Sequence, residues 1–168
     1  KIGVIAHQKT SSLQEALFNN AYGIPAGKLG SHLLKESTEQ LTATYPHILQ
    51  IPNEKVLKIE GQFPEFTVVT NKSNYETRLI VVGIGAANTF DIEGLMQHVE
   101  PHQKSLPQKE RIQLKNSDHK VTEGIYVIGT LAGWRSQLAI AAGSGAAVAT
   151  DILTLWNEGI QTHAHDSI

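Results

Sequence analysis

The sequence predicts one α/β domain with a Rossmann-like, mainly parallel sheet and a three-stranded β-meander in the middle of the chain. Short runs rich in β-branched residues alternate with helix-like patterns, and three strand patterns follow one another between residues 48 and 71. The length of 168 residues suits a single domain with one substantial core. This fold class does not by itself fix a function.

Apolar runs bounded by turn residues predict the strands, with Pro52, Gly61 and Pro64 among the residues that separate them. The predicted strands are residues 1–6, 48–51, 55–60, 66–71, 75–82, 111–114 and 124–129. Apolar spacing predicts a helix over residues 29–43 with Ser31 as its N-cap, and a small-residue helix over residues 137–158, either continuous or in two parts. We expect the domain to span residues 1–158, with a polar connection at 88–120 and a flexible tail at 159–168.

The composition excludes several kinds of chemistry. The chain has no cysteine, which rules out a dithiol active site, a cysteine nucleophile, a zinc–cysteine cluster and an iron–sulfur centre within it. A net charge of -2 and a pI of about 6.5 argue against nucleic-acid binding. The sequence shows no apolar run as long as a membrane span and no signal-peptide pattern at its first residues, so we expect a cytoplasmic protein without a membrane partner.

The stretch 124–150 carries the most chemical information. A buried strand ends at Gly129, a loop follows, and a helix opens near Ser136 and Gln137. Its first N–H groups lack intrahelical partners and suit an electron-rich or anionic group. Gly143 and Gly145 each cost a helix interior about 1 kcal/mol relative to alanine, which calls for either close packing on a sheet or close approach of a ligand. Physical reasoning alone favours close packing.

This stretch resembles the C-terminal flavin-binding motif of thioredoxin reductase-like, FAD-dependent pyridine nucleotide-disulfide oxidoreductases. In that family a strand ends in Gly-Asp, and the following helix opens with Arg-Gln and continues Ala-x-x-x-Ala-Gly-x-Gly. In this chain Gly129-Thr130 corresponds to the family's Gly-Asp, and Ser136-Gln137 corresponds to its Arg-Gln. Residues 142–145 correspond to its Ala-Gly-x-Gly. The resemblance implies an FAD cofactor, with the backbone N–H groups of Gln137 and Leu138 directed at the N1/O2 side of the flavin ring.

Weaker motifs follow in the family's order along nearly the whole chain, from Lys1 to about Trp156. Residues 19–25 resemble the family's Glu-Asn-Tyr-Pro-Gly-Phe-Pro loop, and the helix after them resembles its Gly-x-x-Leu helix. The run 80–86, which includes Gly85, resembles the strand that leads into Ala-Thr-Gly. By this order, residues 1–6 correspond to the family's second strand, so His7 and Gln8 stand where an acidic residue binds the adenosine ribose.

The sequence also departs from the family in ways that weaken the expectation of bound FAD. Thr130 replaces the aspartate that holds the ribitol hydroxyls, so no charge-assisted hydrogen bond is available there. The Gly-x-Gly-x-x-Gly loop, the nicotinamide domain and the redox Cys-x-x-Cys are missing. We expect about 30 residues carrying the family's first βα unit to lie upstream of Lys1; loss of flavin, or a strand supplied by a partner chain, are the alternatives.

Two residues near the expected ring allow two interpretations each. Trp134 either shields the flavin or packs at the surface, and Arg135 either meets an anionic ligand or is solvated. Tyr22 lies beside the ring by resemblance, although a buried structural tyrosine is the simpler expectation. No histidine pair has a convincing metal spacing, so we expect no metal site and solvated histidines at 98, 102, 119, 163 and 165.

The leading hypothesis is an oxidoreductase-like flavoprotein that transfers electrons through FAD without a disulfide of its own. Its reductant would be a redox partner protein or freely diffusing NAD(P)H, and a homodimer is possible as in the family. The catalytic residues stay open. The alternative is a non-enzymatic binding or scaffold protein that kept the fold and lost the cofactor; Thr130 and His7 favour this alternative, whereas the helix opening at Gln137 favours a flavoprotein.

Overall fold

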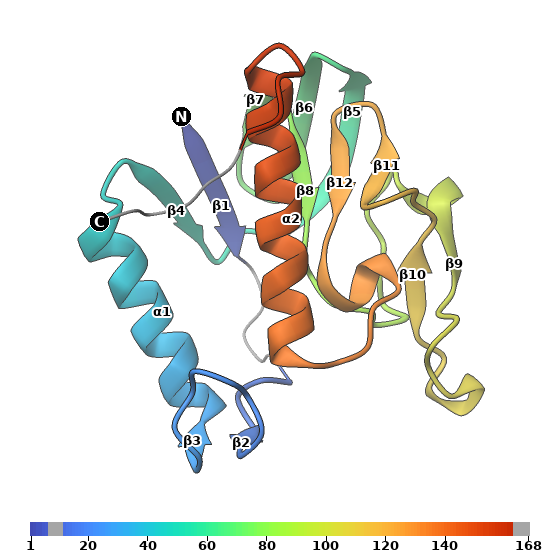
Figure 1. Ribbon diagram of the computed structural model, residues 1–168. Coiled ribbons are helices and arrows are strands. Elements are labelled where there is room, and N and C mark those ends of the chain that lie inside the picture. The colour runs from blue at the N-terminus through green and yellow to red at the C-terminus, as the bar shows by residue number, and fades with distance from the viewer. Residues whose placement is uncertain (7–11, 163–168) are drawn as a thin grey trace. The chain divides into compact units, whose positions relative to one another are not determined.

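The computed structural model describes residues 1–6 and 12–162. They form two compact units (Figure 1). The first unit is made from the described residues up to Lys58 together with residues 68–75, and the second from residues 59–67 and 76–162. Each unit is described by itself below.

The first unit contains a parallel strand–helix–strand arrangement. Strand β1 (Ile2–Ala6) pairs in parallel with β4 (Ile48–Pro52), so that Ile2 lies opposite Ile48, and helix α1 (Gly30–Thr44) lies between them in sequence. The short strands β2 (Leu17–Phe18) and β3 (Lys28–Leu29) pair antiparallel before α1. The predicted strands at 1–6 and 48–51 and the helix at 29–43 are therefore confirmed.

Helix α1 begins one residue before the predicted cap. Leu29 is the N-cap residue and makes no side-chain capping hydrogen bond, so the prediction of Ser31 was wrong. The start is set by Gly30, which is buried: a Cβ there would lie 1.7 Å from the Leu13 carbonyl oxygen. Gly30 also donates its N–H to the Ala16 carbonyl, so backbone contacts replace the side-chain cap.

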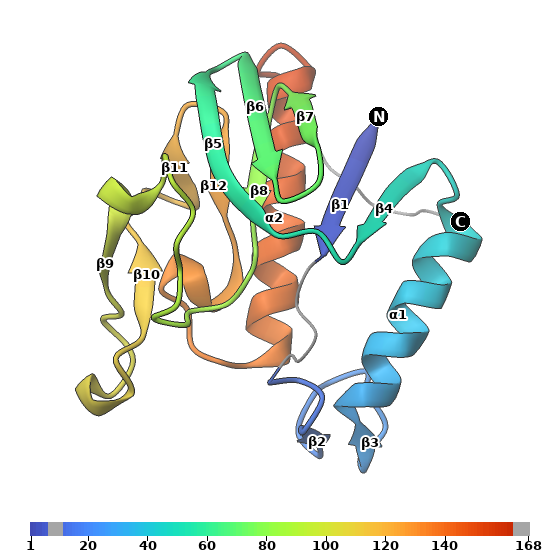
Figure 2. The same ribbon diagram turned by 180° about the vertical axis from the view of Figure 1, so that it is seen from behind.

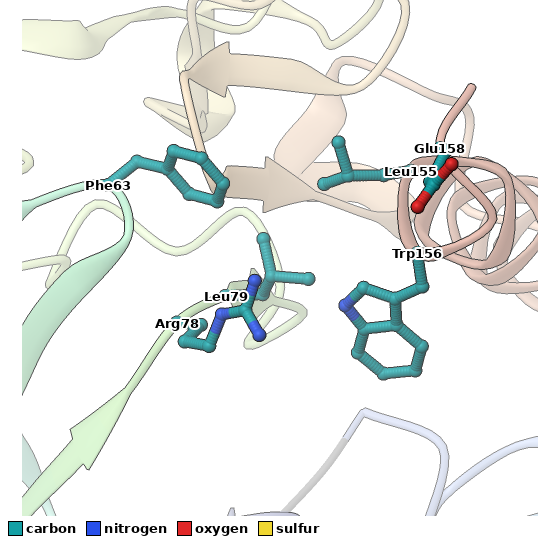
Figure 3. Close-up of a pocket in the computed structure, with 6 residues that line it drawn as sticks. All are labelled: Phe63, Arg78, Leu79, Leu155, Trp156 and Glu158. Carbon is teal, nitrogen blue, oxygen red and sulfur yellow. The ribbon is translucent and has the colours of Figure 1, made fainter.

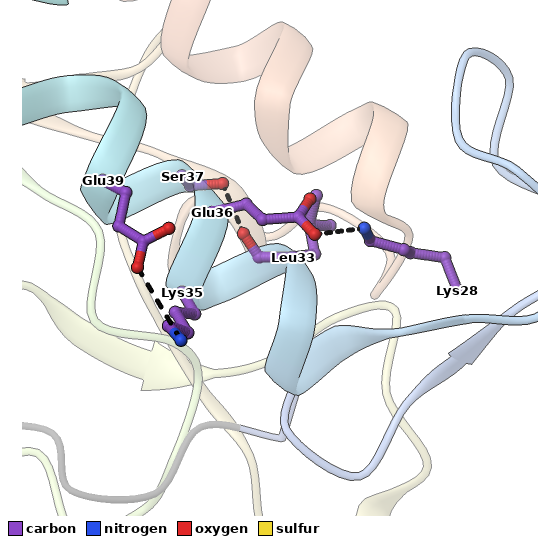
Figure 4. A network of polar contacts seen from close by, with 6 residues as sticks. All are labelled: Lys28, Leu33, Lys35, Glu36, Ser37 and Glu39. Atoms are coloured by element: carbon purple, nitrogen blue, oxygen red, sulfur yellow. Dashed lines mark hydrogen bonds and ion pairs between the residues drawn. The ribbon is translucent and has the colours of Figure 1, made fainter. Parts of the chain in front are cut away.

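Surface polar contacts line α1 (Figure 4). Lys28 pairs with Glu36, Lys35 pairs with Glu39 one turn along, and the Ser37 hydroxyl donates to the Leu33 carbonyl. Exposed pairs of this kind contribute a few tenths of a kcal/mol to about 1 kcal/mol each. They support the helix without fixing its position.

A three-stranded sheet has the order β5 (Val56–Gln62), β6 (Glu65–Thr70), β7 (Asn74–Thr77). The predicted meander is thus displaced by one strand along the chain, because residues 48–52 pair with β1 and not with β5. The predicted strand 75–82 is also divided into β7 and β8 (Ile80–Val82). Thr77 ends β7, since its hydroxyl donates to the Leu79 carbonyl two residues on.

The second unit is built around β12 (Ile125–Val127), which lies between β8, its parallel partner, and β11 (Lys120–Thr122), its antiparallel partner. Strands β9 (Val99–Pro101) and β10 (Ile112–Leu114) form an antiparallel pair within the polar connection. Short 3-10 helices occur at Met96–His98 (η1), Pro107–Lys109 (η2) and Gly129–Ala132 (η3). The largest fully buried side chains are Leu95, Leu114, Leu131, Val127 and Val148.

The pairs β1–β4 and β8–β12 are parallel, and they belong to two separate small sheets. The architecture is therefore mixed α/β with several small sheets. The expectation of one mainly parallel sheet is met only in these two pairs. Figure 2 shows the same strands from behind.

Helix α2 (Leu138–Trp156) is one continuous helix that ends the second unit (Figure 1). Within the described part of the chain it is the one helix long and apolar enough to cross a membrane by length and composition, contrary to the sequence-based expectation that no such run exists. A single helix of this kind is weak evidence for a membrane span, because core helices of soluble proteins pass the same test.

Candidate functional site

The turn from β12 into α2 is fixed by a buried serine. Gly129 has a φ of +65°, and its N–H donates to the Ser144 hydroxyl oxygen at 2.8 Å. The same hydroxyl donates to the Ala141 carbonyl at 2.7 Å, and Ser144 is only 4% exposed. Ser144 therefore joins the start of the loop to the interior of α2. The sequence motif places a variable residue here, so this role could not be recognised from it.

The N-terminus of α2 has no side-chain cap among the described residues. Gln137 is the N-cap residue, with an extended backbone, and no side chain caps the helix. Ser136 and Gln137 are exposed, and Leu138 is half-buried. The N–H groups of the first turn thus have no side-chain acceptor, and they carry the positive end of the helix dipole. This is the arrangement that an electron-rich group needs.

The glycines of α2 are not explained by tight packing among the described residues. A Cβ at Gly143 would have no neighbour within 4 Å, and one at Gly145 would meet only the Ile128 Cδ1 at 3.8 Å, an ordinary contact. Gly83 differs, because a Cβ there would lie 2.9 Å from Ile128 Cγ1, between neighbouring strands. Gly143 is exposed, so the expectation of close packing on a sheet is not met at this position among the described residues.

Two predicted site residues lie beyond the carboxyl ends of neighbouring parallel strands. Val82 of β8 is paired with Val127 of β12, so Gly85 and Thr130 each follow by three residues. Gly85 has a φ of +85° with open space where a Cβ would be, and Thr130 is half-buried in η3. Ligands of α/β proteins bind at this end of parallel strands. His7 and Gln8 lie outside the described residues.

A histidine that the sequence predicted as solvated is buried beside this loop. His119 is 6% exposed; its Nδ1 lies 2.8 Å from the Val127 carbonyl oxygen, and its Nε2 lies 3.3 Å from the Trp134 Nε1. Nδ1 must donate to a carbonyl and Nε2 must accept from an indole N–H, which assigns the Nδ1–H tautomer. The Lys104 ammonium lies 4.4 Å from the Trp134 ring centroid.

The structure bears on three further expectations, those for His102, Tyr22 and Trp134. His102 is also buried, so the prediction of solvated histidines was wrong at positions 102 and 119. Tyr22 is fully exposed, so it is not a buried structural tyrosine. Trp134 is 40% exposed but is held by His119, which places it between the two interpretations offered for it. In the described residues no group of three or more His, Cys, Asp or Glu side chains could hold a metal.

Two cavities lie in the second unit. The larger, of about 440 Å³, adjoins the C-terminal end of α2 and contains no predicted site residue (Figure 3). It is lined by Phe63, Arg78, Leu79, Leu155, Trp156 and Glu158. The smaller, of about 220 Å³, adjoins the loop before α2 and includes Ser136. Of the predicted site residues, the structure thus groups Gly85, Gly129 and Thr130 at two strand ends, and Ser136, Gln137 and Leu138 at the opening of α2.

Comparison with known proteins defines the fold of the chain. No family model and no curated protein matches it. Among solved structures it is similar to a ferredoxin–flavin thioredoxin reductase from Clostridium acetobutylicum, with a TM-score of 0.66, 14% identity, and 92% of this chain and 88% of that chain covered. A thioredoxin reductase from Gloeobacter violaceus has a TM-score of 0.68 and 12% identity, with 90% of this chain and 84% of that chain covered. An oxidoreductase from Agrobacterium tumefaciens has a TM-score of 0.72 and 11% identity, with 93% of this chain and 90% of that chain covered.

These likenesses show the fold alone, since the identities lie between 11% and 14%. The chain has the fold of thioredoxin reductase-like flavin oxidoreductases. The resemblance inferred from the sequence is therefore confirmed at the level of the fold.

Proposed function

We propose that this chain binds FAD and acts as a thioredoxin reductase-like oxidoreductase that passes electrons through the flavin without a disulfide of its own. The observation that carries the proposal is the uncapped N-terminus of α2, which follows a parallel strand in a chain with this fold. The absence of cysteine agrees with it, because the chain's own thiols cannot be the electron acceptor. We place the protein in the cytoplasm, with NAD(P)H or a redox protein as its electron donor.

The residues present fit the flavin ring end of the cofactor. The backbone N–H groups of Gln137 and Leu138 would face the N1/O2 side of the ring, and the dipole of α2 would stabilise negative charge there. Ser136 would lie beside them, and Thr130 and Gly129 would approach the ribitol. Bound FAD would supply one- and two-electron transfer. Gly85 would meet a further part of the cofactor, and His7 and Gln8 lie outside the described residues.

One N–H group of this site can be removed without changing a side-chain charge. Leu138 is the first residue of α2, the position where helices accept proline, and Gln137 before it is already extended, as a residue preceding proline must be. Leu138→Pro therefore keeps the helix start but removes the N–H that would face the flavin. Leu138→Ala is the matched control, because it shortens the same side chain and keeps the N–H.

The test is a titration of each variant with FAD, followed by flavin fluorescence. We expect Leu138→Pro to bind FAD about tenfold or more weakly than Leu138→Ala, the effect of losing one hydrogen bond to a charged or strongly polar acceptor. Circular dichroism checks that both variants retain their helix content. Equal FAD affinity of the two folded variants would contradict the placement of the flavin ring at α2.

The second candidate is a binding or scaffold protein that kept the fold without the cofactor. The observation in its favour is Thr130, which has no carboxylate for the ribitol hydroxyls. If this candidate is right, wild-type protein will not bind FAD at all, whereas weak binding that Leu138→Pro lowers further supports the flavoprotein.

A further inference from the structure

The charged side chains that line the smaller cavity of the second unit are all positive. It lies between the segment that joins β9 to β10 and the loop before α2, and its lining residues are His102, Lys104, Ser105, Leu106, Lys109, Arg111, Trp134, Arg135 and Ser136. Four of these carry a positive charge and none is a carboxylate. The chain as a whole has a net charge of -2, so this concentration of cations does not follow from the composition.

The four cations make no ion pair with a carboxylate of the described residues. In the part of the chain that the structure describes, none of them forms an ion pair, whereas Lys28, Lys35 and Lys120 each do. The cations concerned are Lys104, Lys109, Arg111 and Arg135. Like charges gathered around one cavity repel each other, and a bound anion relieves that repulsion.

The acidic side chains nearest in sequence are turned to other partners. Glu100 accepts a hydrogen bond from the Gln113 amide at 2.7 Å. Glu110, between two of the cations in sequence, accepts one from the Asn88 amide at 3.3 Å. Neither Glu100 nor Glu110 lines the cavity. The positive charge of the cavity is therefore not neutralised by a carboxylate from β9, β10 or the segment between them.

Part of the wall is held in place before any ligand arrives. The Trp134 indole N–H donates to Nε2 of the buried His119. The Lys104 ammonium lies over the Trp134 ring, 4.4 Å from its centroid. The Lys104 backbone N–H donates to Nδ1 of the buried His102 at 3.1 Å. Binding to a site fixed in this way costs less conformational entropy than ordering free lysine side chains.

We propose that this cavity binds a small ligand through a diphosphate group. At about 220 Å³ the cavity has room for a small anion such as a diphosphate. The two arginines offer planar, bidentate donors that match phosphate oxygens, and the lysines add point charges. Because the Lys104 ammonium lies over one face of the Trp134 ring, that face is not free for a stacked base. The cavity shares Ser136 with the proposed flavin site, but its four cations and Trp134 were not assigned to that site.

Trp134 provides a direct readout. The chain has two tryptophans, so Trp156→Phe leaves Trp134 as the single indole reporter in the cavity wall. Titration of this variant with sodium pyrophosphate at low ionic strength, without added FAD, should give a saturable change in tryptophan fluorescence with one site. The affinity should fall as salt is raised, because screening weakens charge–charge attraction. Calorimetry of the wild-type chain should give the same dissociation constant.

Charge neutralisation separates a built site from general attraction. Arg135→Gln and Lys109→Gln should each weaken pyrophosphate binding about tenfold or more. Arg78→Gln is the matched control, because Arg78 is a cation that lines the other cavity, and it should leave the affinity unchanged. If Arg135→Gln loses its circular dichroism spectrum, Lys109→Gln, on the exposed η2 turn, provides the same test.

Four results would overturn the proposal, of which three concern pyrophosphate binding and the control variant. These are no saturable change up to about 10 mM pyrophosphate, an equal loss of affinity in Arg78→Gln, or tighter binding of a polyglutamate peptide than of pyrophosphate, which would indicate an acidic protein partner. Titrations with ADP and with orthophosphate show which phosphate group the cavity recognises. ADP that binds as tightly as pyrophosphate, with weaker binding of orthophosphate, supports recognition of the diphosphate. Orthophosphate binding as tightly as pyrophosphate would contradict it.

Discussion

At the scale of single residues, His119 holds the loop before α2 in place. Its ring connects the Val127 carbonyl of β12 with the indole of Trp134, and its backbone N–H is bonded to the Asn116 side chain. Asn116 in turn donates to the carbonyls of Leu114 and Ala132. The loop next to the proposed flavin position is therefore positioned by buried polar contacts.

We expect His119→Ala to lower the free energy of unfolding by about 2–3 kcal/mol, because it removes buried packing and leaves the Val127 carbonyl without its side-chain partner. Trp134→Phe should cost about 1 kcal/mol, since it removes the indole N–H bond to His119 and part of a ring that is 40% exposed. Urea unfolding followed by circular dichroism measures both values. His98→Ala, at a half-buried position, is the control, and an equal loss there would contradict this role of His119.

Tyr126 should make stability depend on alkaline pH. Burial raises the pKa of its phenol above the usual value, with Lys120 opposing the shift. The folded chain keeps this proton at a pH where the unfolded chain loses it, so the contribution is present below about pH 10 and is lost as pH rises through the folded pKa. Tyr126→Phe should make the fall in the free energy of unfolding above about pH 10 less steep. If the free energy of unfolding falls with pH equally steeply in Tyr126→Phe and wild type, the raised pKa of Tyr126 is contradicted.

At the scale of elements, α2 is joined to the loop that precedes it by Ser144. We expect Ser144→Ala to lower the free energy of unfolding by about 1–3 kcal/mol, because the half-buried Gly129 N–H loses its acceptor, and to weaken FAD binding as the loop loosens. Thr150→Ala is the matched control in the same helix, since its hydroxyl bonds only the Ala146 carbonyl at an exposed position. Differential scanning calorimetry and the FAD titration compare the two. Equal effects would show that Ser144 has no special role.

The elements of regular pattern could be predicted from the sequence, and those set by particular contacts could not. Residues 1–6, 48–51 and 111–114 and the helix ending near residue 156 follow from apolar spacing and β-branched composition. The start of α1 depends on how Gly30 fits against Leu13, and the end of β7 on the Thr77 hydroxyl. Such contacts involve single atoms and leave no periodic signal.

At the scale of the whole molecule, the order of weak motifs along the chain was more informative than any single motif. It led to the fold later found in the solved structures, although the identities are only 11–14%. The pairing of strands could not be predicted in the same way: residues 48–52 pair with β1, far earlier in the chain, and not with the strand that follows. The basic cavity also brings together residues 102–111 and 134–136, which only the tertiary structure places side by side.

The central claim is that this fold carries a flavin, and the visible absorbance spectrum of the purified protein tests it most directly. The spectrum is recorded as purified, after addition of FAD and removal of the excess, and after heat release of any bound ligand. We predict two flavin bands in the protein fraction and FAD in the supernatant after heating. A folded protein that stays colourless after incubation with FAD would contradict the claim and favour the scaffold alternative.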